Sequence, residues 1–83
     1  ICRIEEKYYR KLENAINEVI KNNKTTIVML KDIKEDSYIH ENKNIVIDLS
    51  NKTIEGSFKI ENQAHLEIKN GTVESDKIVL LMS

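Results

Sequence analysis

Two stretches of the chain repeat one another, VIDLSNKTIEG at residues 46–56 and HLEIKNGTVES at residues 65–75. Placed 19 residues apart, they match apolar residues with apolar residues, Thr with Thr and Glu with Glu. The apolar positions that coincide are Ile47 with Leu66, Leu49 with Ile68, and Ile54 with Val73. A 19-residue repeat is too short for a pair of helices, and it is typical of a solenoid whose coils stack on one another.

A weaker copy precedes these two, and it places Val28 and Leu30 at the inward positions of the first strand. Glu35 falls where Ile54 and Val73 stand, so we expect Ile33 to take that place. Each copy contains strands of three to five residues in which apolar and polar residues alternate. The apolar side chains should point into the coil and stack on their counterparts, each burial contributing about 1.5–3 kcal/mol.

Asn51 and Asn70 occupy the same place in the two copies, in the turn after the first strand. Asn tolerates the positive φ angles that tight turns need. Stacked Asn side chains can also donate hydrogen bonds to one another along a solenoid. We therefore expect these two residues to form a structural turn ladder, with no role in binding a ligand.

The first 24 residues have a different pattern. Their apolar residues recur at helical spacing, at positions 1, 4, 8, 12, 15, 16, 19 and 20. Acidic residues come early and Lys21 and Lys24 come late, as suits the helix dipole. The sequence therefore predicts an amphipathic helix over residues 1–24, capping about three coils over residues 25–83 within one domain.

The composition of the chain argues against several classes of function. The 83 residues include 13 basic and 14 acidic side chains, so no net charge draws the chain to nucleic acid or to a membrane surface. Cys2 is the only cysteine and offers neither an internal disulfide nor a cysteine metal site. The apolar run IVLLM at residues 78–82 is too short to cross a bilayer. We expect no cofactor, no metal site and no membrane insertion.

The stretch KNIVIDLSNKTIEG (43–56), followed by AHLEIKNGTVES (64–75), resembles the right-handed parallel β-helix of the pectate-lyase-like superfamily. The likeness is strongest to the N-terminal coils of bacterial surface and secreted proteins. It implies a mostly-β chain on the cell surface or outside the cell, with polysaccharide as a possible partner. Lyases of this type use an arginine and clustered aspartates that hold Ca²⁺. Here Arg3 and Arg10 lie on the predicted helix.

The acidic residues at matched places, Asp36, Glu55 and Glu74, are expected to form an exposed column and not a Ca²⁺ site. His40 and His65 do not share a register and are expected on the surface. These observations favour a chain without catalytic residues, although whether the whole protein is an enzyme stays open.

We therefore expect a structural or interaction module of a bacterial surface or secreted protein, cut from a longer chain. Its last strand, Ile78 to Met82, should expose a sheet edge and lead to self-association. One alternative is the first part of a carbohydrate-active enzyme whose catalytic coils lie downstream. Another is a carbohydrate-binding module, for which Tyr38 offers an aromatic surface. A leucine-rich repeat is disfavoured because Asn51 comes only two places after Leu49 and the period is short.

Overall fold

The computed structural model describes residues 1–75 and 78–80, with side-chain positions for residues 1–75. These residues form short strands and one short helix, α1 (Leu12–Glu18), which confirms the mostly-β class. The strands in chain order are β1 (Cys2–Ile4), β2 (Lys7–Tyr9), β3 (Thr25–Met29), β4 (Ile33–Lys34), β5 (Ser37–Ile39), β6 (Asn44–Asp48), β7 (Thr53–Glu55), β8 (Phe58–Ile60), β9 (His65–Lys69), β10 (Thr72–Glu74) and β11 (Ile78–Leu80).

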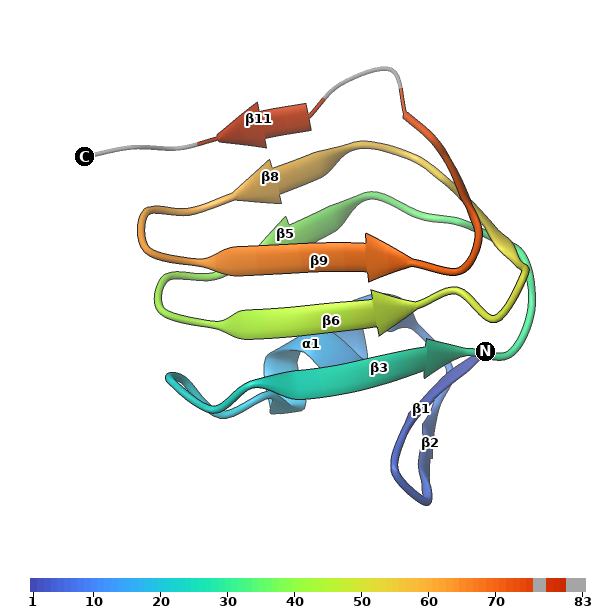
Figure 1. Cartoon of the computed structure of the whole chain (residues 1–83), viewed down its shortest axis with the longest axis horizontal. Helices are drawn as coiled ribbons and strands as arrows, with labels where there is room; N and C mark the ends of the chain where they lie inside the picture. Colours follow the sequence, from blue (N-terminus) through green and yellow to red (C-terminus); the bar gives the residue numbers. More distant parts are fainter. Residues whose placement is uncertain (76–77, 81–83) are drawn as a thin grey trace.

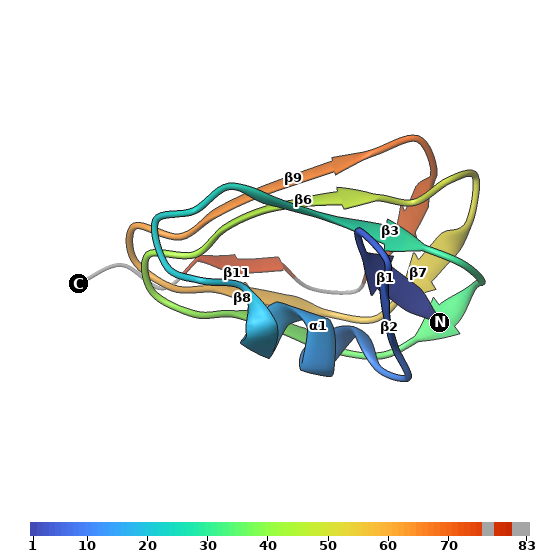
Figure 2. The ribbon, with the colours of Figure 1, turned by 90° about the horizontal axis from the view of Figure 1, so that it is seen from below.

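The strands assemble into three sheets, which the chain visits in turn. The five-stranded sheet has the order β2-β1-β3-β6-β9, and the two three-stranded sheets have the orders β10-β7-β4 and β11-β8-β5. From β3 onward, every neighbouring pair within a sheet is parallel, because the chain returns to each sheet one layer further on. Figure 1 shows β3, β6 and β9 lying above one another, and Figure 2 shows the three sheets surrounding a common interior.

One predicted column of core residues is confirmed. Ile54 on β7 is paired with Val73 on β10, at the 19-residue spacing that the repeat gives. On its other side Ile54 is paired with Ile33 on β4, the residue expected to replace Glu35. Ile54 is fully buried, and Ile33 and Val73 pack against the same core.

In the five-stranded sheet the register differs from the sequence match. Ile47 is paired with Ile68, which is 21 residues later, so the expected pairs of Ile47 with Leu66 and of Leu49 with Ile68 are wrong. The bends explain the difference: four residues connect β6 to β7, but two connect β9 to β10. Leu49 lies in the longer bend, is completely buried and occupies the space beside Gly71. A Cβ atom on Gly71 would lie 2.3 Å from the Cβ atom of Leu49.

The expected inward positions of the first copy are also wrong, by one residue. Ile27 on β3 is paired with Ile47, a spacing of 20, and Ile27 and Met29 are the buried residues. Val28 is half-buried on the opposite face, and Leu30 is 41% exposed. Because successive strand residues point to opposite faces, a register change of one residue exchanges the inner and outer faces.

Only Leu12–Glu18 of the helix predicted over residues 1–24 is helical, so the prediction is wrong for residues 19–24 and for the first ten residues. These form an antiparallel hairpin of β1 and β2, which turns at Glu5 with a φ of 51°. Strand β1 pairs antiparallel with β3 and so extends the five-stranded sheet beyond β3. Ile1, Ile4 and Tyr8 fit a helical spacing, but three-residue strands are too short to show their own period-two pattern.

Helix α1 covers the end of the core next to β5 (Figure 2), and its inward face is buried at Leu12, Ala15 and Ile16. Two charged side chains from later in the chain hold its ends. Glu35 accepts hydrogen bonds from the main-chain N–H groups of Leu12 and Glu13, at 3.3 and 2.9 Å. The Lys43 Nζ donates to the carbonyl oxygen of Ile16 at 2.7 Å. Both charges have the sign that the helix dipole favours.

Candidate functional site

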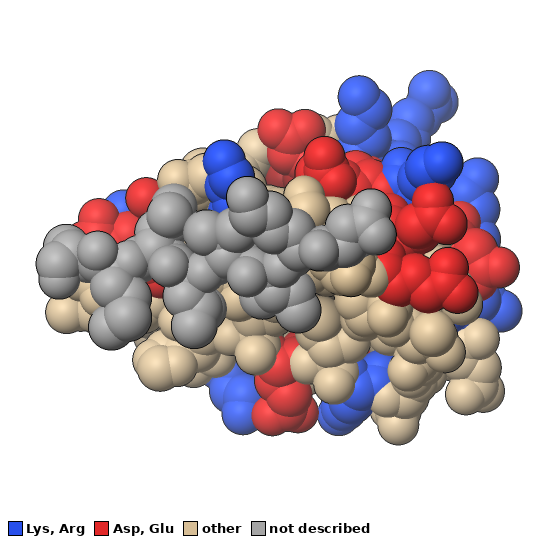
Figure 3. All heavy atoms as spheres, turned by 90° about the horizontal axis from the view of Figure 1, so that it is seen from above, with Lys and Arg blue, Asp and Glu red and all other residues tan. Residues whose placement is uncertain are grey.

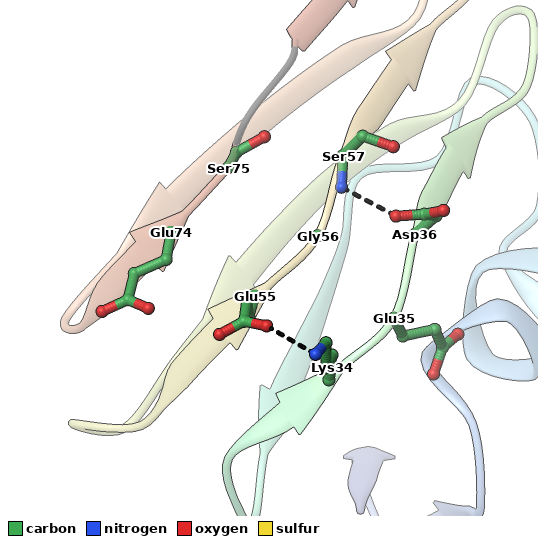
Figure 4. A pocket seen from close by; sticks show the side chains of 8 residues that line it. All are labelled: Lys34, Glu35, Asp36, Glu55, Gly56, Ser57, Glu74 and Ser75. Carbon is green, nitrogen blue, oxygen red and sulfur yellow. Dashed lines mark hydrogen bonds and ion pairs between the residues drawn. The ribbon is translucent and has the colours of Figure 1, made fainter.

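A shallow groove lies where the two three-stranded sheets meet (Figure 4). More charged side chains line this groove than line any other surface hollow described. It is built from three bends, which run from β4 to β5, from β7 to β8, and onward from β10. The residues that line it are Lys34, Glu35, Asp36, Glu55, Gly56, Ser57, Glu74 and Ser75. We take this groove as the first candidate site.

Close packing between the bends sets the floor of the groove. Gly56 has a φ of 151°, and a Cβ atom there would lie 2.2 Å from the carbonyl oxygen of Glu35. The Gly56 N–H donates to the carbonyl oxygen of Glu74 at 2.9 Å, and the Glu35 N–H donates to that of Glu55, also at 2.9 Å. Only glycine fits between the first and second bends at this position.

The carboxylates in the groove are held by neighbouring groups. One oxygen of Asp36 accepts a 2.9 Å hydrogen bond from the main-chain N–H of Ser57. That bond, followed by one from the Ser57 hydroxyl, lowers the pKa of Asp36. Glu55 forms an ion pair with Lys34 at 3.2 Å, and both side chains are largely exposed. Glu35 turns away from the groove toward α1 (Figure 4).

The acidic column expected from the sequence holds for Glu55 and Glu74, which are paired, but it is wrong for Asp36. The residues that align across β4, β7 and β10 are Lys34, Glu55 and Glu74, because β4 is shifted by two residues relative to the 19-residue match. Asp36 lies beyond the end of β4, in the bend. A cation thus stands where a third carboxylate was expected, and it relieves the repulsion in the row. Acidic and basic side chains lie next to each other at the right-hand end in Figure 3.

This arrangement gives the groove little of the chemistry of a metal or acid–base site. Over residues 1–75 no group of three or more His, Cys, Asp or Glu side chains is placed to hold a metal ion. Arg3 lies on β1, donates to the carbonyl oxygen of Glu5 at 2.8 Å, and lines a different surface hollow. Three of the groove carboxylates instead make contacts within the fold: Asp36 accepts from the next bend, Glu55 pairs with Lys34 on the neighbouring strand, and Glu35 contacts α1.

The two histidines lie apart, as expected. His65 is exposed at the start of β9, opposite Asn44 of β6. His40 follows β5, with its ring centroid 4.7 Å from that of Tyr38 and its Nδ1 atom 3.5 Å from a Glu61 oxygen. Burial and then the Glu61 charge raise the pKa of Tyr38. The sequence did not indicate this cluster, because its members come from two different coils.

Asn51 and Asn70 both have positive φ angles, 65° and 61°, in agreement with their predicted turn role. They are connected through the main chain, where the Asn51 N–H donates to the Asn70 carbonyl oxygen at 2.6 Å. The Asn70 side chain donates to Asp48 at 3.2 Å, so the expected side-chain bond between the two Asn residues is replaced by this one. A second stack of positive φ angles lies at the opposite corner, which the sequence analysis missed, at Asn22, Asn42 and Gln63.

The last strand of each sheet provides the second candidate site. Among residues 1–75 and 78–80, no strand pairs with the outer side of β9, β10 or β11, and these three strands are here called the open edge. Half-buried apolar side chains lie along it at Leu66, Ile68 and Val73. The segment expected to self-associate begins here, since β11 covers Ile78–Leu80, while residues 81–83 lie outside the described part.

No family model matches the chain, and searches of curated proteins and of solved structures also find no match. Within the part of the chain described, no helix has the length and apolar character needed to cross a membrane.

Proposed function

We propose that this chain is a parallel β-helix module of three coils, right-handed as in the family that it resembles, and that its function is structural. One end of the stack is covered by its own N-terminal segment, and the other end associates with another polypeptide through the open edge. The bacterial surface or secreted setting, and contact with polysaccharide there, belong to the same proposal and rest on the sequence resemblance.

The coil assignment is supported by the order of the strands. Each of the three sheets receives one strand from every passage of the chain, always parallel to the strand of the previous passage. Equivalent residues lie above one another, as in the column of Ile33, Ile54 and Val73. Stacked coils of a solenoid bury their apolar residues in this way, since one coil alone has no core.

The observation that carries the functional proposal is the difference between the two ends. At one end, the hairpin of β1 and β2 extends the sheet of β3, and α1 covers β5 and is held by Glu35 and Lys43. At the other end, the open edge presents main-chain groups and half-buried apolar side chains. An exposed strand edge of this kind is a template for pairing with another chain.

The groove supports a structural role as well. Three of its four carboxylates are used within the fold: Asp36 binds the next bend, Glu35 caps α1, and Glu55 pairs with Lys34. Such contacts connect coils and set their stacking. A general acid or base would instead need a carboxyl group directed at a substrate.

The test is the solution mass of the chain by light scattering and sedimentation across a wide concentration range. We expect the mass to rise to twice the monomer mass as concentration increases. Ile68→Pro, which places a proline on the open edge, should lower the association without unfolding the coil. Tyr8→Lys, on the exposed hairpin at the covered end, is the matched control and should leave association unchanged.

A wild-type chain that stays monomeric at every concentration would contradict the proposal. So would a loss of association in Tyr8→Lys equal to that in Ile68→Pro, because it would place the contact at the covered end. Circular dichroism of each variant at high dilution establishes that the fold is retained.

A further inference from the structure

Strand β9 carries charged side chains of opposite sign on one face, so that two copies of the strand can pair with opposite charges facing each other. His65, Glu67 and Lys69 are exposed on the outer face of the sheet. Leu66 and Ile68 are half-buried and face the core. A negative and a positive charge thus stand two residues apart on the same face, at the edge where the sheet ends.

The hydrogen bonds of β9 decide which residues can pair with a new strand. The His65 N–H donates to Lys43, and the Lys69 carbonyl accepts from Leu49, so both residues direct their main-chain groups toward the β6 side. Main-chain groups of successive strand residues point to alternate sides. The N–H and C=O groups of Leu66 and Ile68 therefore face the open edge.

We propose that two copies of this chain pair through β9, antiparallel and about a twofold axis at Ile68, so that Glu67 of each copy faces Lys69 of the other. This inference rests on the proposed association through the open edge and adds the partner and the register. The Ile68 residues then form the hydrogen-bonded pair. Glu67 and Lys69 fall on the flanking non-hydrogen-bonded pairs, where side chains lie closest.

Other antiparallel registers lack this complementarity. An axis at Glu67 sets the two Glu67 side chains opposite each other, which repels. An axis at Leu66 sets Glu67 opposite His65 and Lys69 opposite Gln63, so Lys69 has no acidic partner within the strand. Only the axis at Ile68 makes two symmetric pairs between permanently charged groups within the strand.

The covered end explains why the second copy joins head to head. A head-to-tail stack needs a free edge at β3 and β5, where the β1 strand and α1 lie. An antiparallel neighbour is already compatible with this sheet, because β1 pairs with β3 in that orientation. A twofold contact through β9 uses the β9 edge in both copies, so the assembly closes as a dimer.

The test uses charge reversal at the two exposed positions. Glu67→Lys and Lys69→Glu each set like charges opposite one another twice, and each should raise the dimer Kd about tenfold. The double variant Glu67→Lys/Lys69→Glu restores opposite charges and should return the Kd to within about threefold of wild type. Glu41→Lys, at another exposed position, controls for the change in net charge.

The possible outcomes separate the two proposals. Weakening by each single variant with recovery in the double variant supports the register. The register is overturned if the single variants leave the dimer Kd unchanged, or if the double variant does not restore it. In either case the association through the open edge still stands. A monomeric wild-type chain overturns both. Urea unfolding of each variant under dilute conditions shows whether the change at Lys69, next to Asp48, alters the monomer itself.

Discussion

The carboxylate of Glu35 accepts a 2.9 Å hydrogen bond from the main-chain N–H of Glu13, which lies 22 residues earlier in the chain. Lys11, at the N-cap position of α1, provides no side-chain hydrogen bond of its own. The helix is therefore capped by a side chain from the bend that follows β4. Because each part completes the other, the helix and this part of the sheets should form and unfold together.

Glu35→Ala should lower the free energy of unfolding by about 1 kcal/mol, within the 0.5–2 kcal/mol measured for lost helix caps. Glu35→Gln should cost less, since its amide oxygen still accepts one hydrogen bond. Glu41→Ala is the control, because Glu41 is an exposed glutamate outside this contact. Urea unfolding followed by circular dichroism measures all three. Equal stability of Glu35→Ala and Glu41→Ala would show that the contact does not hold the cap.

Two aspartates should make the fold sensitive to acid. Hydrogen bonds from Ser57 lower the pKa of Asp36, and hydrogen bonds first from Ser50 and then from Asn70 lower that of Asp48. A folded-state pKa below the unfolded value stabilises the fold above pH 3.8, and this stabilisation is lost as pH falls through the folded pKa. Carboxyl chemical shifts in an NMR titration should give both folded pKa values below 3.8.

The matched variant Asp36→Asn keeps the acceptor oxygen but has no proton to bind. The stability difference between wild type and this variant should shrink as the pH falls below 3.8. A difference that stays constant from neutral pH into acid would contradict the assigned cause.

Gly71→Ala should destabilise the chain by about 1–3 kcal/mol, as an overpacked core does. The added Cβ atom would stand 2.3 Å from the Cβ atom of Leu49 and 2.5 Å from the carbonyl oxygen of Lys52. Leu49→Ala alone opens a cavity. It removes the Cδ1 atom that would lie 2.9 Å from the new Cβ atom but keeps the Leu49 Cβ atom, so it relieves part of the clash made by Gly71→Ala. The double variant should therefore cost less than the sum of the single changes. Additive costs in urea unfolding would show that the two bends do not touch as described.

Cys2 reports on the covered end of the core. It is fully buried, and burial raises the pKa of its thiol, so little thiolate is available to a reagent. A disulfide reagent should react slowly with the folded chain and rapidly in urea. Leu12→Ala, which loosens α1 over the same cluster, should speed the reaction of the folded chain. Equal rates with and without urea would mean that the hairpin does not bury Cys2.

The sequence predicted the repeat and part of the core, because these depend on local patterns. The match between Ile54 and Val73 holds because these two residues are paired at the same 19-residue spacing that the sequence repeat has. The match between Ile47 and Leu66 fails because the bend at Leu49 to Lys52 is longer than the one at Asn70 and Gly71. Equal sequence spacing gives the right register only when the bends have equal lengths.

The structure of the covered end could not be predicted from local sequence patterns. Residues 1–10 form strands because β3 offers an edge on which β1 can pair, and that edge exists only in the folded chain. Glu35 and Lys43 reach α1 from 22 to 27 residues away in the sequence. The sequence contains one sign that Glu35 has a special role, since Glu35 stands at an apolar position of the repeat. It contains no such sign for Lys43.

Amide hydrogen exchange at β9 tests the central claim most directly. Under dilute conditions the Ile68 N–H should exchange rapidly, because it faces the open edge, while the Glu67 N–H should be protected by β6. At concentrations where the mass has doubled, the Ile68 N–H should become protected and Glu67 should change little. Protection of Ile68 that does not depend on concentration, or rapid exchange in the dimer, would contradict association through this edge.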